Sequence, residues 1–167
     1  MVSFPNSAVR AVCTGLAPQL KGVPASLDAG RVMLAIAAVE SGGNDPNEAG
    51  NDCDPRHEPA YDAGGGFYNK SAIQRSLVAL NGSGAACSYG PWQMMFCNFA
   101  PGTTIGSLGD LNALALNFVR WFNICVPRHT PSNLDEIGEI WNSGTIRPDP
   151  AYVAKLAQAY AATGDPE

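Results

Sequence analysis

The chain has 167 residues, of which 46% are hydrophobic, so it can bury a substantial core as one domain over residues 1–167. Its 15 acidic and 10 basic residues give a net charge of −5, which argues against nucleic acid as the principal partner. No apolar run approaches the roughly 18 residues of a membrane span, so we expect no membrane insertion. The N-terminus lacks the basic and apolar segments of a signal peptide. The chain is therefore expected either to be made in a cytoplasm or to be the mature form of a longer product. We also expect it to be a monomer.

The first half of the chain predicts three helices and a long polar loop. The first helix is expected over 7–20, and the second from the N-cap Asp28 to Glu40. Residues 44–66 are rich in Asn, Asp, Gly and Pro and are typical of a loop. A short helix should follow over 71–80. Its expected buried face consists of Ile73, Leu77 and Leu80. The sequence shows no convincing strand pair, although 44–70 has room for a small β-hairpin.

The second half predicts three more helices. Asp110 caps the best-defined one, whose apolar spacing runs through Leu111, Leu114, Ala115, Phe118, Trp121, Phe122 and Cys125. A short helix over 134–141 follows the Ser132/Asn133 cap. The last begins at Asp149 and Pro150 and stops near Gly164. Its expected inward side chains are Val153, Leu156, Ala157 and Tyr160.

The cysteines leave the redox chemistry open. There are five, at Cys13, Cys53, Cys87, Cys97 and Cys125. Two disulfides with one free thiol, or buried thiols throughout, agree equally well with this count. No CxxC or His-rich spacing suggests zinc, so we expect no metal and no cofactor. A hydrolase that uses a cysteine with His57 or His129 has no local sequence signature to support it.

Glu40 is the most informative residue. The apolar stripe of its helix, formed by Val32, Met33, Ile36 and Val39, lies on the same side as Glu40, so this carboxyl should face the core. Burial and the nearby helix C-terminus both disfavour its charged form, which raises the pKa toward general-acid use. Ser41-Gly42-Gly43 then ends the helix beside it. The alternative is a glutamate at the edge of the core that pairs with Arg or Lys.

Three further clusters accompany Glu40 in the chain. The four segments, in order, are Glu40-Ser41, Gly90-Pro91-Trp92-Gln93, Ile140-Trp141-Asn142 and Tyr152-Val153. With these motifs the sequence resembles the lytic transglycosylases of the soluble and goose-type lysozyme-like group, over about residues 28–160. The resemblance implies a mainly α, lysozyme-like fold (formally α+β): one compact helical domain with a catalytic cleft.

The resemblance also implies an activity. Such enzymes cut the MurNAc–GlcNAc β-1,4 bond of peptidoglycan, so the expected partner is a glycan strand of the bacterial cell wall, in the periplasm or outside the cell. Glu40 would protonate the glycosidic oxygen and then, as carboxylate, accept a proton from the sugar's own 6-hydroxyl, giving a 1,6-anhydroMurNAc product. A phage-encoded enzyme or a secretion-system accessory would fit the apparent lack of a signal peptide.

The resemblance assigns substrate-binding roles to the other matched residues. Ser41 and Gln93 would hydrogen-bond the sugar acetamido group, Tyr152 would donate to Glu40 or to ring substituents, and Asn142 would hold a sugar hydroxyl. Flat apolar faces for sugar rings are expected from Trp92, Met94 and Tyr61. We expect the remaining large apolar residues of these segments, Met95, Phe96 and Trp141, to belong to the core.

Two departures from the family pattern leave alternatives open. Pro91-Trp92 and Trp141 replace the usual residues, and residues 50–83 look like an insertion. This insertion carries the possible second carboxylates Asp54, Glu58 and Asp62, which a hydrolytic goose-type lysozyme would need in order to activate water. A noncatalytic glycan-binding or structural virion domain on the same fold is the alternative of another class.

Overall fold

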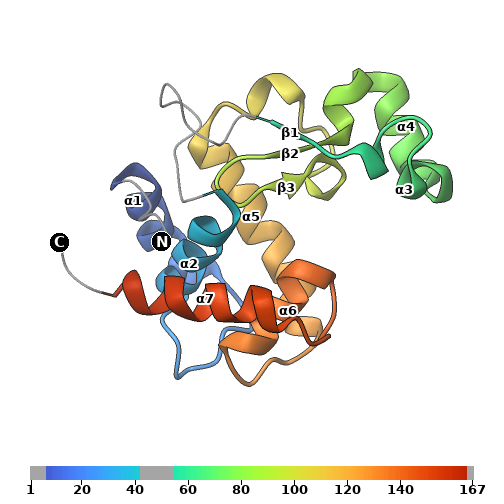
Figure 1. Ribbon diagram of the computed structural model, residues 1–167. Coiled ribbons are helices and arrows are strands. Elements are labelled where there is room, and N and C mark those ends of the chain that lie inside the picture. Colours follow the sequence, from blue (N-terminus) through green and yellow to red (C-terminus); the bar gives the residue numbers. More distant parts are fainter. Residues whose placement is uncertain (1–6, 42–54, 165–167) are drawn as a thin grey trace.

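The fold is mainly helical, as predicted, with a small three-stranded antiparallel sheet (Figure 1). The structure, a computed structural model, describes residues 7–41 and 55–164. Its α-helices are α1 (Ser7–Leu16), α2 (Ala29–Ser41), α3 (Gly66–Lys70), α4 (Ala72–Asn81), α5 (Leu111–Cys125), α6 (Leu134–Ser143) and α7 (Pro150–Ala162). Its strands, in sheet order, are β1 (Arg56–His57), β2 (Cys87–Tyr89) and β3 (Met94–Met95).

Side-chain caps start the main helices where the sequence predicts them. A side-chain oxygen accepts a hydrogen bond from a backbone N–H in the first turn of five helices, and the capping residues are Asp28, Ser71, Asp110, Asn133 and Asp149. These bonds satisfy donors that a helix N-terminus otherwise leaves unpaired. The first helix differs from its prediction: α1 ends at Leu16, and the 3-10 turn Ala17–Gln19 follows, because Pro18 has no N–H to continue an α-helix.

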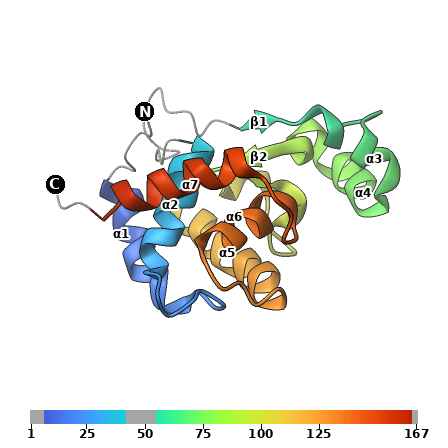
Figure 2. The ribbon, with the colours of Figure 1, turned by 60° about the horizontal axis from the view of Figure 1, so that its bottom comes forward.

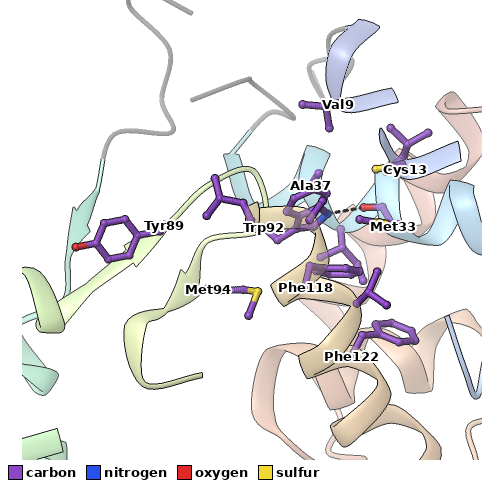
Figure 3. Packing of buried hydrophobic residues seen from close by; sticks show 14 of the residues in the cluster. Val9, Cys13, Met33, Ala37, Tyr89, Trp92, Met94, Phe118 and Phe122 are labelled. Atoms are coloured by element: carbon purple, nitrogen blue, oxygen red, sulfur yellow. Dashed lines mark hydrogen bonds between the residues drawn. The ribbon is translucent and has the colours of Figure 1, made fainter. Parts of the chain in front are cut away.

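The hydrophobic core forms around α2 and α5 (Figure 3). Trp92 lies between these two helices with 1% of its surface exposed; its indole N–H donates to Met33 O at 3.0 Å. Its ring lies 5.0 Å from that of Phe118, which also contacts the rings of Phe122 and Trp141. Most of α2 is buried, so this helix runs through the interior and brings its C-terminal end to the site described below.

The sheet, α3 and α4 form an arm on one side of the helical bundle (Figures 1 and 2). The predicted hairpin within 44–70 is wrong over the described part of that segment. Its strand β1 pairs with β2, thirty residues later, and β2 pairs with β3 through the turn Gly90–Gln93. Strands of two or three residues are too short for an alternating apolar pattern, which is why sequence analysis missed β2 and β3. The five-residue helix α3 is likewise too short for a helical apolar pattern.

Helix α4 exposes two of the three residues that sequence analysis predicted to be buried, and only Leu77 packs against the core. Ile73 and Leu80 are 70% and 81% exposed, whereas Gln74 is fully buried. The Gln74 amide donates to Tyr61 O at 2.8 Å and to Ala85 O at 2.9 Å, so α4 is attached to the rest of the arm through a buried polar side chain. These hydrogen bonds offset the cost of burying the amide nitrogen, whereas Gln74 Oε1 is buried without a hydrogen-bond partner among the described residues. A smaller correction applies to α7, where Ala159 is buried and Ala157 is exposed.

The helices in the described ranges are all too short or too polar to cross a lipid bilayer.

Candidate active site

A cavity of about 350 Å³ opens beside the C-terminal end of α2. Its walls come from α2, the β2–β3 hairpin, α5 and the end of α6, with Tyr61 from the arm. The lining residues are Glu40, Tyr61, Gln93, Met94, Met95, Asn98, Trp121, Cys125, Ile140, Trp141, Asn142, Ser143 and Gly144. Among these residues Glu40 is the sole carboxylic acid. The cavity therefore combines one acid with amides and aromatic rings, a set suited to an uncharged polar ligand.

Glu40 occupies the second-last position of α2 and is half-buried. Burial raises the pKa of its carboxyl above the usual 4.5, and the nearby negative charge of Glu58 adds to this. Hydrogen bonds from Tyr152 and Trp141 and the positive charge of Arg56 lower the pKa, but burial is the largest effect. None of the ion pairs in the described ranges involves Glu40, so the alternative of a carboxylate paired with Arg or Lys finds no support there.

Tyr152 in the first turn of α7 makes the closest polar contact with Glu40. Its hydroxyl donates to Glu40 Oε1 at 2.8 Å, and the two residues are far apart in the sequence. Burial and the charge of Glu40 raise the pKa of Tyr152, so the phenol keeps its proton and remains a donor. The prediction that Tyr152 lies beside Glu40 agrees with this geometry.

Asp149 connects two of the predicted site residues. One carboxylate oxygen accepts from Tyr152 N at 3.1 Å and the other from Asn142 Nδ2 at 2.8 Å. Asp149 therefore holds the start of α7 and the end of α6 together at the cavity. Gly144 ends α6 with φ +79°, a backbone conformation that favours glycine, two residues after the exposed Asn142. Sequence analysis identified Asp149 only as a helix cap, and nothing in the sequence pairs it with Asn142.

Gln93 is held at the cavity wall by its own hairpin. Its Nε2 donates to Gly90 O at 2.9 Å and its Oε1 accepts from Ser88 Oγ, also at 2.9 Å. Gln93 has φ +44° and Gly90 has φ +72°, so this turn needs two left-handed residues. A Cβ on Gly90 would also approach Leu114 to 2.8 Å. The sequence motif therefore places Gln93 in the wall of the cavity that Glu40 lines, but Ser88, which orients the Gln93 amide, was not predicted.

Two predicted substrate-binding residues have structural roles instead. Trp92 is buried in the core and offers no face to a sugar, because its turn directs the ring between α2 and α5. Ser41 is also buried and does not line the cavity; its hydroxyl donates to Pro91 O at 2.8 Å and ties the end of α2 to the hairpin turn. Both residues position Glu40 and Gln93 relative to each other, and the predicted sugar contacts of Trp92 and Ser41 are wrong.

The apolar faces of the cavity come from residues other than Trp92. Tyr61 lies at its edge with its ring 4.3 Å from that of Phe67, and Met94 lines it although little of its surface is exposed. Trp141 was predicted to be a core residue, yet it lines the cavity, and its side chain lowers the pKa of Glu40. Further lining residues that sequence analysis missed or placed in the core are Met95, Asn98 and Trp121. Trp121 and Trp141 follow the apolar spacing of their helices, so their sequence signal was indistinguishable from that of core residues.

The two described candidates for a second carboxylate, Glu58 and Asp62, do not line the cavity. Asp62 accepts from Ala63 N at 2.7 Å and contacts His57 Nε2 at 2.8 Å, and these contacts hold its pKa below the usual range. Glu58 accepts from Arg56 Nε at 2.7 Å, and it is close enough to Glu40 to influence its pKa. Asp54 lies outside the described residues. The described part of the 50–83 segment is folded and contributes only Tyr61 to the cavity wall.

The cysteines provide neither a disulfide pair nor a nucleophile that the geometry supports. Cys13, Cys87, Cys97 and Cys125 are free thiols, so the alternative with two disulfides does not hold; Cys53 lies outside the described residues. Burial raises the pKa of all four thiols, which disfavours the reactive thiolate. Within 7–41 and 55–164, no group of three or more His, Cys, Asp or Glu side chains is arranged to hold a metal ion.

Comparison with known proteins gives no relative from which a role could be transferred: no family model, curated protein or solved structure matches the chain. The functional argument therefore depends on the geometry of the cavity.

The raised pKa of Glu40 predicts a pH-dependent cost to stability. The folded chain binds a proton at Glu40 more tightly than the unfolded chain does, so the free energy of unfolding should fall as pH rises from about 4.5 through the folded-state pKa. Glu40→Gln removes this titration and should be more stable than wild type at neutral pH, with the difference vanishing in acid. Urea unfolding of both proteins over a pH series measures the effect. A stability difference that is constant across pH would show that Glu40 titrates normally.

Proposed function

We propose that this protein is a muramidase of the lytic transglycosylase type, which cleaves the MurNAc–GlcNAc β-1,4 bond of peptidoglycan with Glu40 as general acid and base. The observation that carries the proposal is that Glu40 is the one carboxyl among the described lining residues, with its pKa raised by burial and its Oε1 2.8 Å from the Tyr152 hydroxyl. A carboxyl whose pKa is raised by burial keeps its proton to higher pH than a free carboxyl does, and it can donate that proton to a leaving-group oxygen. The order of the four sequence motifs supports the same assignment.

The proposed reaction needs one acid. Glu40 gives its proton to the glycosidic oxygen as the bond from that oxygen to C1 breaks, and positive charge develops on the sugar ring. The Glu40 carboxylate then accepts the proton of the sugar's 6-hydroxyl, whose oxygen forms the new bond to C1. No water is consumed, and the proton returns to Glu40. The donors Tyr152 and Trp141 stabilise the carboxylate between the two steps, which keeps the acid from being too weak.

The surroundings of Glu40 favour this route over hydrolysis. An enzyme that releases a reducing end must position and activate a water molecule with a second group. In the described part of the chain, the carboxylates of the arm point to other partners: Asp62 contacts His57, and Glu58 accepts from Arg56. Asp149 accepts hydrogen bonds from the Asn142 amide and from Tyr152 N in the first turn of α7.

The remaining cavity residues suit a sugar chain. Gln93 and Asn142 line the same cavity as Glu40, with their amides oriented by the hairpin and by Asp149. Tyr61 and Trp141 provide aromatic surfaces against which a sugar ring can pack. All four lie within one cavity although they come from three separate segments of the chain: the arm, the β2–β3 turn and α6. Their contacts with a glycan remain predictions, and the proposed place of action is the bacterial cell wall.

Mass spectrometry of muropeptides released from purified cell walls tests the proposal. We expect 1,6-anhydromuramyl ends, which are one water lighter than reducing ends, and little loss of turnover in Asp54→Asn, Glu58→Gln or Asp62→Asn. Reducing ends, together with inactivation by one of these three substitutions, would identify a lysozyme-type hydrolase instead. If the folded protein binds the walls and releases no fragments, the noncatalytic alternative is correct.

A further inference from the structure

A second cavity, away from Glu40, is lined by two arginines that form no ion pair with any described residue. It has a volume of about 370 Å³ and lies between α1, the start of α2 and the C-terminal end of α7. These three helices are neighbours in both views of the fold (Figures 1 and 2). The lining residues are Arg10, Thr14, Ala17, Pro18, Asp28, Gly30, Arg31, Leu34 and Thr163. None of them lines the first cavity.

Both guanidinium groups are held in place by the end of α7. Arg31 Nη2 donates to Tyr160 O at 2.6 Å, and its guanidinium carbon lies 4.3 Å from the centre of the Tyr160 ring. Gly164 packs so closely on this guanidinium that a Cβ there would approach Nη2 to 2.4 Å. Arg10 Nη1 donates to Thr163 O at 3.4 Å. The two side chains therefore enter the cavity wall in a fixed arrangement rather than as mobile surface groups.

The positive charge in this cavity is not neutralised. Arg10 Nη2 and Arg31 Nε are shielded from solvent and have no hydrogen-bond partner. The ion pairs of the described residues include neither arginine. Asp28 is the one carboxylate in the wall, and its Oδ1 accepts from Arg31 N as the cap of α2. Two partly desolvated guanidinium groups with a single carboxylate nearby leave a net positive site, which an anion would stabilise.

We propose that this cavity binds a phosphate group. Guanidinium groups bind phosphate oxygens through paired, charge-assisted hydrogen bonds, and two of them line the wall. After Asp28 is counted, the net charge is one positive unit, which matches the single negative charge of a phosphodiester. This inference does not depend on the proposed activity at Glu40.

Titration of the full chain with inorganic phosphate, followed by the NMR resonance of the Arg31 Nε–H group, tests the site. We expect saturable shifts in phosphate and none in chloride at equal ionic strength. Arg10→Met should weaken phosphate binding about tenfold or more, because it removes a charge-assisted hydrogen bond. Lys155→Met, which removes one exposed positive charge from α7, is the matched control and should bind as wild type does. A parallel titration with dimethyl phosphate separates the two sources: binding identifies a phosphodiester, and its absence a free phosphate or monoester.

The fold of each variant is verified before its affinity is compared. If Arg10→Met does not fold, Arg10→Lys retains the charge but loses the planar donor pair, and it should bind more weakly than wild type. The proposal is overturned if the Arg31 signal shows no saturable response to either phosphate. Equal affinity in wild type and Arg10→Met would overturn it as well, because the phosphate would then bind elsewhere.

Discussion

Replacement of Glu40 by Gln is expected to reduce the release of muropeptides from cell walls by at least about 100-fold. Gln has nearly the same shape, and its amide oxygen can still accept from the Tyr152 hydroxyl, which lies 2.8 Å from Glu40 Oε1. It cannot donate and recover a proton, so the loss should appear in turnover rather than in folding. Initial rates on purified walls, with circular dichroism to verify the fold, measure the effect.

Tyr152→Phe and Glu58→Gln are the matched controls for this result. Tyr152→Phe removes a hydrogen bond that lowers the pKa of Glu40, so the alkaline limb of the pH–rate profile should move to higher pH. Glu58→Gln removes a negative charge that raises the pKa of Glu40, so the alkaline limb should move to lower pH, with only a modest change in rate. If folded Glu40→Gln retains near-wild-type turnover, the assignment of the active site is wrong.

Truncation of Trp92 to Ala should lower the free energy of unfolding by about 3–5 kcal/mol, the range seen when large aromatic residues are removed from a core. The ring is almost completely buried, packs 5.0 Å from Phe118 and donates to Met33 O. This expectation reverses the sequence-based role of Trp92 as a surface for sugar. Chemical denaturation of the purified variant measures the loss.

Two substitutions separate packing from ligand binding. Trp92→Phe keeps most of the apolar volume and loses the indole hydrogen bond, so it should cost less than Trp92→Ala. Tyr61→Ala changes a half-buried ring at the rim of the cavity and should reduce wall cleavage more than stability. If Trp92→Ala is as stable as wild type but binds glycan poorly, the ring must face the cavity and the packing account fails.

Local sequence signals were sufficient for the helices. Asp28, Asp110 and Asn133 each cap the helix that the sequence assigns to them, because a cap needs only a side-chain oxygen and the next three residues. The orientation of Glu40 was equally local: the apolar stripe of α2 turns the carboxyl toward the interior, and burial raises its pKa. The sequence by itself therefore determined the helical class of the fold and the candidate acid.

Long-range contacts determined the rest. Trp92 and Trp141 carry the same aromatic signal, yet the Gly90–Gln93 turn buries one while the packing of α6 brings the other to the cavity. Gln74 is buried because Tyr61 and Ala85, in other segments, supply acceptors for its amide. Such partners become neighbours only when the chain is folded, and no periodicity within one segment encodes them. The sequence alone determined which segments become helices and which acid faces inward, whereas only the tertiary structure decided which side chains share the cavity with that acid.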